Sequence, residues 1–320
     1  GLRAQDRETG HTLELHARCV VNATGVWVDQ LRMQDGQAIG RAAKPIVAPS
    51  QGVHIVVDRA FLPSDHAMLI PKTADGRVLF AVPWLGKTIL GTTDTPRHDL
   101  AREPLPFREE VDFILRESAR YLSRAPGPAD IKSIWVGLRP LVKPADDEAG
   151  STQSLSREHT ILVSKSGLVT VTGGKWTTYR AMAADVLEKC FDAELLPTRI
   201  GMPTDHLKLV GAQSSSVRIS DAPGLHLYGS EAAAVQALPG AERELGGGLT
   251  EAMVRFAARY EYARTVEDVL ARRARLLFLD AALARSLAPA VAVLLQQENG
   301  MDAQLQSFLA LCDQYLRVPV

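Results

Sequence analysis

The chain has 320 residues, of which 46% are hydrophobic and 23% are charged, and its formal net charge is -1 at pH 7. These values are ordinary for a globular protein, and the length allows two domains with substantial cores. A net charge this close to zero argues against a nucleic-acid-binding protein and a polybasic membrane anchor. The cysteines at 19, 190 and 312 lack Cys-x-x-Cys spacing, which indicates neither a disulfide framework nor a zinc site and is typical of a reducing, cytosolic setting.

The N-terminal residues predict strands that lead into a helix. Residues 2–21 form a strand pair around a turn at 8–10, and Val-Val-Asn-Ala-Thr-Gly at 20–25 indicates a strand entering a turn of small residues, with a short helix at 26–31. This order is typical of the last part of a nucleotide-binding domain, although the sequence contains no Gly-x-Gly-x-x-Gly fingerprint. Gly246-Gly247-Gly248 is predicted to be a loop between helices with no strand before it.

The middle of the chain predicts an antiparallel sheet rather than alternating strands and helices. Strands are expected at 53–57, 67–71, 78–83 and 88–91, with a hairpin turn at Asp75-Gly76. A helix near 109–122 and a strand at 131–141 follow, and residues 143–156 are polar and are interpreted as a surface loop. A second hairpin is expected from residues 160–164 and 168–172.

Residues 168–180 are the most informative stretch. Leu-Val-Thr-Val-Thr predicts a short buried strand, Gly173-Gly174 a tight exit where the backbone can approach a ligand, and the residues from Trp176 a helix. The free N–H groups and the positive dipole end of this helix favour an anionic or electron-rich ligand, and Lys175 adds a full charge. A mononucleotide P-loop is excluded, because Val169 and Trp176 occupy the positions that require Gly and Ser or Thr. Such a turn alone is more often structural than ligand-binding.

Beyond residue 197 the composition favours helices, which are expected at about 250–262, 265–279, 282–297 and 301–316. Thr265 and Asp268 have the spacing of a capping box. Arg272, Arg273 and Arg275 fall on the outer side of the second helix and are interpreted as a solvated face. This region is predicted to be a separate helical domain.

Five motifs, in order and at matching spacing, resemble a known family across essentially the whole chain. They are Val-Val-Asn-Ala-Thr-Gly-Val-Trp (20–27), Gly-Thr-Thr-Asp (91–94), Gly-Leu-Arg-Pro-Leu (137–141), Ser-Arg-Glu-His-Thr (156–160) and Gly-Gly-Lys-Trp-Thr-Thr-Tyr-Arg (173–180). The sequence is similar to the FAD-dependent, quinone-linked (aerobic) glycerol-3-phosphate dehydrogenases, which belong to the amino-acid-oxidase-like flavoenzyme superfamily. Each motif alone is weak, but five in order are specific.

The resemblance implies a mixed α+β/α/β fold with three kinds of domain. Residues 1–48 would be the tail of an FAD-binding domain, 49–135 an antiparallel-sheet substrate domain, 136–196 a return segment to the FAD-binding domain, and 197–320 an all-helical C-terminal domain. The family's dinucleotide fingerprint lies upstream of the part that resembles residues 1–30. The sequence is therefore expected to be the C-terminal portion of the enzyme, carrying much of the substrate site and part of the flavin site, and to be inactive without the N-terminal part.

The site residues that the resemblance implies divide into a substrate set and a cofactor set. Arginine binds phosphate oxygens bidentately, and the family match places Arg139 and Arg157 at the phosphate, with Lys175 serving phosphate or substrate hydroxyl and Thr92 facing the pocket. Asp94 is expected to bond local backbone, because a carboxylate would repel phosphate. The residues expected to contact FAD are Ala23, Thr24, Gly25, Gly173, Gly174, Lys175, Trp176 and Thr177.

His54 is the candidate base. By the period of a strand it shares a face with Val56, opposite Val53, Ile55 and Val57. An imidazole titrates near neutrality and suits proton transfer, although a structural histidine fits the strand pattern equally well. The resemblance implies that His54, Lys175 and Arg139 are catalytic.

The resemblance implies oxidation of sn-glycerol 3-phosphate to dihydroxyacetone phosphate, with FAD as cofactor in the complete enzyme and a quinone as electron acceptor. A glycerol-3-phosphate oxidase that uses oxygen shares almost every motif, and a non-catalytic phosphate-binding or assembly fragment is a third interpretation. The expected location is cytoplasmic, with peripheral association at the inner face of the cytoplasmic membrane, because the acceptor dissolves in lipid. A homodimer is compatible with the resemblance, and neither nucleic acid nor a metal is expected.

Overall fold

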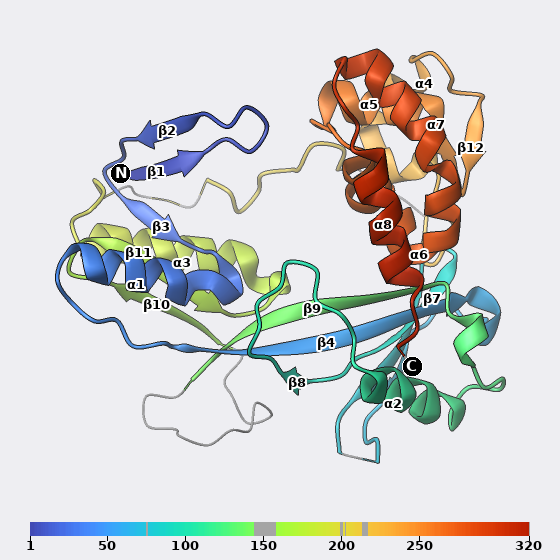
Figure 1. Cartoon of the computed structure of the whole chain (residues 1–320), viewed down its shortest axis with the longest axis horizontal. Helices are drawn as coiled ribbons and strands as arrows, with labels where there is room; N and C mark the ends of the chain where they lie inside the picture. Colours follow the sequence, from blue (N-terminus) through green and yellow to red (C-terminus); the bar gives the residue numbers. More distant parts are fainter. Residues whose placement is uncertain (75, 144–157, 199–200, 202, 213–216, 320) are drawn as a thin grey trace. The chain divides into compact units, whose positions relative to one another are not determined.

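The structure, a computed structural model, describes residues 1–74, 76–143, 158–198, 201, 203–212 and 217–319. It divides into two compact units: unit 1 comprises Gly1–Gln51, Asp94–Pro104 and Gly137–Leu207, and unit 2 comprises Gly52–Thr93, Leu105–Val136 and Lys208–Val320. Two long strands, β4 (Val47–Asp58) and β9 (Ser133–Val142), contribute residues to both units (Figure 1). The finer four-part division expected from the sequence stays a prediction.

Unit 1 contains a hairpin and a three-stranded sheet. The hairpin pairs β1 (Leu2–Gln5) with β2 (Thr12–Leu15), as predicted. In the sheet, β11 (Leu168–Gly173) lies between antiparallel β10 (His159–Val163) and parallel β3 (Val20–Asn22). Helices α1 (Val28–Ala38) and α3 (Tyr179–Asp192) pack against these strands. The predicted hairpin ending at residue 172 is thereby confirmed.

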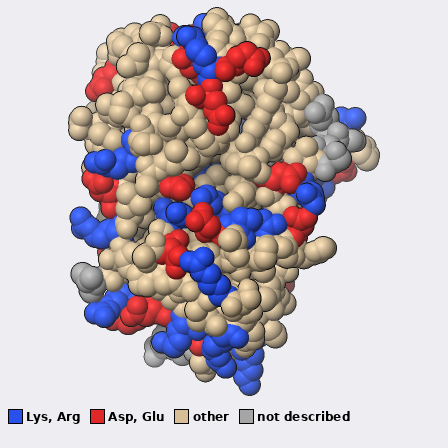
Figure 2. All heavy atoms as spheres, turned by 90° about the vertical axis from the view of Figure 1, so that its right-hand side faces the viewer, with Lys and Arg blue, Asp and Glu red and all other residues tan. Residues whose placement is uncertain are grey.

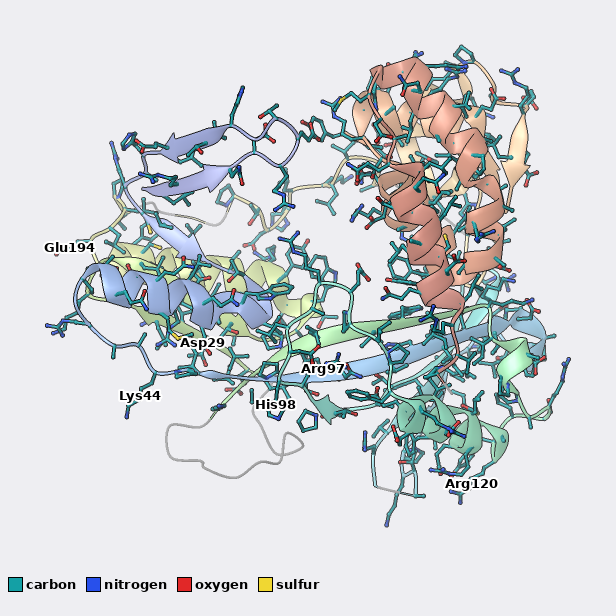
Figure 3. The ribbon with its side chains drawn as sticks, viewed as in Figure 1. Asp29, Lys44, Arg97, His98, Arg120 and Glu194 are labelled. Carbon is teal, nitrogen blue, oxygen red and sulfur yellow. The ribbon has the colours of Figure 1, made fainter. Side chains whose placement is uncertain are left out.

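The carboxylate of Asp29 ties helix α1 to the start of β4 (Figure 3). It accepts hydrogen bonds from the backbone N–H groups of Ile46 and Val47, each at 3.0 Å. Arg32 binds the same carboxylate at 2.7 Å and also donates to the carbonyl of Lys44 at 2.7 Å. Because this largely buried ion pair also satisfies chain amides, it determines where β4 begins.

The predicted antiparallel sheet is present. Its order is β5 (Met68–Ile70), β6 (Leu79–Trp84), β7 (Lys87–Gly91), β4 and β8 (Thr95–Pro96), and β9 pairs with β4 outside this path. In unit 2, helix α2 (Arg108–Ala119) contributes Val111 and Ile114 to a core that also holds Ile55 and Leu90. β4 begins six residues before the predicted strand, because Ser50 and Gln51 extend it by pairing with β8. These two buried residues are polar, so they interrupt the apolar pattern from which a strand is predicted.

The C-terminal residues of unit 2 build a second core around helices. These are α4 (Ala232–Gln236), α5 (Glu251–Tyr260), a π-helical segment (Asp268–Arg273), α6 (Leu276–Leu279), α7 (Ala281–Asn299) and α8 (Leu305–Leu316). Short 3₁₀ segments elsewhere in the chain lie at Gly25–Trp27, Arg59–Phe61, Pro128–Asp130, Trp176–Thr178 and Leu225–Glu231. Of the helices in the described part of the chain, none combines the length and apolar content that crossing a membrane requires.

Three expectations for this region need correction. The helix predicted at 265–279 is interrupted, because Arg275 adopts a left-handed conformation (φ 61°). The region is not all-helical: β12 (Glu244–Gly246) and β13 (Leu249–Thr250) form a hairpin across the glycines, too short for an alternating pattern to reveal. Arg273 is not on a solvated face, since its guanidinium donates to the carbonyl of Glu261 and its side chain is 24% exposed.

The capping box is confirmed. Thr265 Oγ1 accepts from the Asp268 N–H at 3.1 Å, and the Asp268 carboxylate accepts from the Thr265 N–H at 3.0 Å.

Lys and Arg side chains are interspersed with Asp and Glu side chains over the face seen in Figure 2, in line with the balanced net charge.

Two cysteines that are distant in sequence meet in unit 1. The sulfur atoms of Cys19 and Cys190 lie 3.6 Å apart, although 171 residues separate them. Cys190 is fully buried, and this burial, with the neighbouring Cys19 thiol, raises the pKa of Cys190 to about 11. Burial likewise raises the pKa of Cys312 to about 12. Both groups are therefore protonated thiols at neutral pH.

We predict that Cys190 resists alkylation in the folded protein. At pH 8 a thiol with a pKa of about 11 is ionised to about one part in a thousand, against a substantial fraction for an ordinary cysteine. Iodoacetamide labelling followed by peptide mass spectrometry should show Cys190 modified far more slowly than in a guanidinium-unfolded control at the same pH. Equal rates in the two samples would contradict the burial described.

Candidate active site

The predicted strand, glycine turn and helix start are all present at the end of β11. Gly173 and Gly174 have φ values of 77° and 76°, the left-handed region that favours glycine. A 3₁₀ turn at Trp176–Thr178 leads into α3, and the N–H of Thr178 donates to the carbonyl of Lys175 at 3.0 Å. The corner therefore presents helix-start N–H groups beside the exposed side chain of Lys175.

Gly173 is required by its surroundings. An ideal Cβ there would lie 2.6 Å from the carbonyl oxygen of Glu158 and 2.9 Å from Cγ2 of Val142. The carbonyl belongs to backbone, which cannot swing aside as a long side chain can. This turn accepts glycine only.

A matching corner follows β3. Its register pairs Asn22 with Thr170 of β11, and the next residues, Ala23, Thr24 and Gly25, run into the turn that opens α1. Asn22 Nδ2 donates to the carbonyl of Val28 at 2.9 Å, and Thr24 Oγ1 donates to Asn22 Oδ1 at 2.8 Å. A Cβ on Gly25 would meet no heavy atom within 4 Å. Because β3 and β11 are parallel, both corners lie at the carboxyl edge of the pair, where open α/β sheets bind ligands.

Arg139 lies on β9 in unit 1, directly before Pro140. Its Nη1 is 3.8 Å from Oδ1 of Asp94, and its side chain is 30% exposed. Asp94 is 14% exposed and also accepts a hydrogen bond from the hydroxyl of Ser50. Asp94 was expected to bond local backbone, and its carboxylate also contacts the side chains of Ser50 and Arg139, which are distant in sequence. The Asp94 carboxylate orients the Arg139 guanidinium, whose side chain stays partly exposed to a ligand.

His54 lies on β4 in unit 2. Val53, Ile55 and Val57 belong to the same apolar core, as the predicted alternation requires, whereas Val56, although also fully buried, is not part of that core. The His54 imidazole is partly buried and stacks on the indole of Trp135, with ring centroids 4.3 Å apart and an interplanar angle of 16°. Across the sheet it faces Gly91 of β7. Trp135 was not among the residues selected from the sequence, and Gly91 was named only as part of the 91–94 motif, because an aromatic in an apolar strand and a glycine at a strand end are usually structural.

Thr93, next to Thr92, has a structural role. Its side chain is buried, donates to Glu110 Oε1 at 2.9 Å and accepts from the Val53 N–H at 3.0 Å. Thr92 is partly buried and donates to the Thr93 carbonyl at 3.2 Å. In this way the segment that follows β7 is bonded to β4, at the residue before His54, and to α2.

The predicted site residues are distributed over both units. Arg139, Lys175 and the expected FAD contacts belong to unit 1, His54 and Thr92 belong to unit 2, and Arg157 lies outside the described residues. The convergence of Arg139, Arg157 and Lys175 therefore stays a prediction. Within the described residues no group of three or more His, Cys, Asp or Glu side chains could hold a metal ion.

Comparisons with known proteins match two parts of the chain to family models. Residues 1–180 match the family model described as FAD dependent oxidoreductase, and residues 202–306 match the C-terminal domain of alpha-glycerophosphate oxidase. Because the first of these matches covers more than half of the chain, this protein belongs to the FAD-dependent oxidoreductase family.

Similar proteins narrow the relationship within that family. A probable mitochondrial glycerol-3-phosphate dehydrogenase of Caenorhabditis elegans is 38% identical over 96% of this chain and 45% of its own length. The human mitochondrial glycerol-3-phosphate dehydrogenase is 36% identical over 94% of this chain and 44% of its own length. The crystal structure of glycerol-3-phosphate dehydrogenase from Bacillus halodurans complexed with FAD superposes with a TM-score of 0.75 at 27% identity, covering 99% of this chain and 66% of that one. The chain thus spans about half the length of the curated relatives.

We predict that Gly173→Ala destabilises the protein more than Gly10→Ala does. Both glycines have nearly the same φ, 77° and 75°, but a Cβ at Gly10 meets nothing within 4 Å. The control should lose about 1 kcal/mol from left-handed strain, whereas Gly173→Ala adds a backbone clash and should lose clearly more. Denaturant unfolding of both variants measures the difference, and equal losses would mean that the contact with Glu158 relaxes without cost.

Proposed function

We propose that this chain carries part of the active site of an FAD-dependent glycerol-3-phosphate dehydrogenase, which oxidises sn-glycerol 3-phosphate to dihydroxyacetone phosphate. The observation that supports this most strongly is the pair of strand–turn–helix corners at one edge of β3 and β11, in a chain whose relatives are named for this activity. The finer domain assignment is proposed with it: residues 1–48 and 136–196 for the FAD-binding domain, 49–135 for the substrate domain and 197–320 for the C-terminal domain.

The residues at the two corners fit a dinucleotide. Gly25 has open space over its Cα, and Ala23 and Thr24 are small, so a ligand can approach this backbone closely. Residues 173–177 contribute helix-start N–H groups and the charge of Lys175, which would stabilise an electron-rich ring edge by about 1 kcal/mol or more. FAD, when bound, supplies the acceptor for the hydride that leaves carbon 2 of the substrate.

The substrate contacts are assigned by charge. Arg139 is assigned as the primary phosphate ligand, because its side chain is 30% exposed and a guanidinium binds phosphate oxygens in a bidentate manner. Arg157 and Lys175 complete the cationic set, Thr92 contributes a hydroxyl, and Lys175 can also contact the substrate hydroxyl. His54 accepts the proton of the carbon-2 hydroxyl, a role in which a positioned base contributes roughly 10²–10⁴-fold to the rate.

A quinone is the proposed electron acceptor, which implies peripheral association of the cytoplasmic enzyme with the inner face of the membrane. The match of residues 202–306 to a domain of alpha-glycerophosphate oxidase favours oxygen as a second candidate acceptor. Turnover with a quinone analogue in the absence of oxygen, compared with turnover in oxygen alone, separates the two. A folded holoenzyme with neither activity would leave a non-catalytic phosphate-binding role.

Arg139→Ala is expected to weaken binding of glycerol 3-phosphate by about 2–4 kcal/mol while leaving the flavin content unchanged, because it removes a charge that holds the phosphate. The measurements are KM and competitive inhibition by inorganic phosphate in the FAD-loaded enzyme, with Arg116→Ala on α2, whose side chain is 63% exposed, as the control. Equal losses for glycerol and for glycerol 3-phosphate would contradict a phosphate role.

His54→Ala is expected to lower kcat by about 10²–10⁴-fold with little change in KM, because the base acts on the hydroxyl proton rather than on the phosphate. Steady-state kinetics of the FAD-loaded enzyme give both constants. His66→Ala, at an exposed histidine of the same unit, serves as the matched control and should behave as the wild type. An unchanged kcat in His54→Ala removes this residue as the base.

A further inference from the structure

The imidazole of His54 is confined on two sides within unit 2. On β7, Gly91 is its cross-strand partner, and an ideal Cβ at Gly91 would lie 2.5 Å from Cδ2 and 3.1 Å from Cγ of the imidazole. The indole of Trp135 on β9 covers a ring face at a centroid distance of 4.3 Å and an angle of 16°. The absence of a side chain at Gly91 makes space for the imidazole, and the indole of Trp135 covers one of its faces. Together they restrict the imidazole to few orientations.

Trp135 is itself held in place by the C-terminal helices. Its indole meets Phe278 of α6 edge to face, at 5.7 Å and 85°, and Phe278 meets Tyr315 of α8 at 5.8 Å and 70°. The start of β9 is fastened to the same region, because Ser133 Oγ donates to the Leu277 carbonyl at 2.8 Å and the Ala281 N–H donates to the Lys132 carbonyl at 3.0 Å. The indole plane is thus positioned by backbone bonds and by rings packed behind it.

Stability alone does not account for a tryptophan at this position. Its Nε1 is buried, and no described residue accepts a hydrogen bond from it. An unpaired buried donor is unfavourable, and a phenylalanine would fill an apolar site without one. What the indole supplies instead is a broad, flat surface parallel to the imidazole.

We propose that Trp135 is a positioning residue that sets the orientation of the His54 imidazole, with Gly91 as the clearance that makes this orientation accessible. The inference rests on the proposed role of His54 as the base. A base transfers a proton efficiently only when its nitrogen is held in line with the substrate hydroxyl, and small displacements are costly in rate. Trp135 therefore acts on kcat through His54 and does not contact the phosphate.

The kinetic test compares Trp135→Leu, Trp135→Phe, His54→Ala and the Trp135→Leu/His54→Ala double variant in the FAD-loaded enzyme. Trp135→Leu should lower kcat by roughly 10–100-fold with KM within about twofold, because binding contacts remain while ring orientation is lost. Trp135→Phe should recover most of the loss. In the double variant, loss of Trp135 should add nothing to the loss from His54→Ala, since a residue that acts only through His54 has no further effect without it.

The structural test measures the stack directly and does not depend on activity. In protein labelled at histidine, the ring C–H proton resonances of His54, assigned by their absence in His54→Ala, should be displaced upfield by the indole ring current. Trp135→Leu should return them to ordinary positions and Trp135→Phe should retain part of the displacement. Trp84→Leu, which removes another partly buried tryptophan of unit 2, is the control and should leave them in place.

Gly91→Ala tests the orientation of the His54 imidazole at its second neighbour, and this test does not require Trp135→Leu to fold. The added Cβ would displace the imidazole, so kcat should fall with KM unchanged and the His54 resonances should move.

Wild-type kcat in Trp135→Leu or Gly91→Ala, while His54→Ala is impaired, would overturn the positioning role and leave the proposed function intact. An unimpaired His54→Ala would remove the base and this inference with it. Multiplied losses in the double variant would mean that Trp135 acts by another route, and would also overturn the inference.

Discussion

The parallel pairing of β11 with β3 is the interaction on which the candidate cofactor site depends. Asn22 and Thr170 are 148 residues apart, yet both are buried in this register and their side chains lie 3.4 Å apart. Because the strands run in the same direction, each ends at the same edge and continues through a left-handed glycine into a helix. One backbone pairing thereby brings the starts of two helices, with their N–H groups, to a single edge of the strand pair in unit 1.

In unit 2 the apolar core determines the position of His54. Val53, Ile55 and Val57 fill the core together with α2, and strand alternation then requires His54 to point to the opposite face. On that face the ring meets Gly91 and Trp135, and Trp135 also packs against the core of the C-terminal helices. The helices that follow residue 250 are therefore part of the surroundings of the candidate base, although they contain none of the residues assigned to the chemistry.

Several features of the fold and site could be predicted because they are local. The strand, Gly173-Gly174 turn and helix start follow from adjacent residues, as does the Thr265–Asp268 capping box. The break at Arg275 and the short hairpin at Gly246–Gly248 were missed, since a few residues carry no periodic signal. The pairing of Asp94 with Ser50 and Arg139 was missed because it joins segments that are distant in the chain.

The sequence by itself determined the family, the order of most of the longer strands and helices, and the residue types suited to phosphate and flavin, because motifs and periodicity depend on neighbouring residues. Only the tertiary structure decided which of these residues have neighbours that restrict them. The contact of Cys19 with Cys190, the carboxylate beside Arg139 and the indole over His54 each depend on strands or helices pairing across long stretches of chain. Packing selects such contacts through the shape and burial of the whole unit, and no local pattern records them.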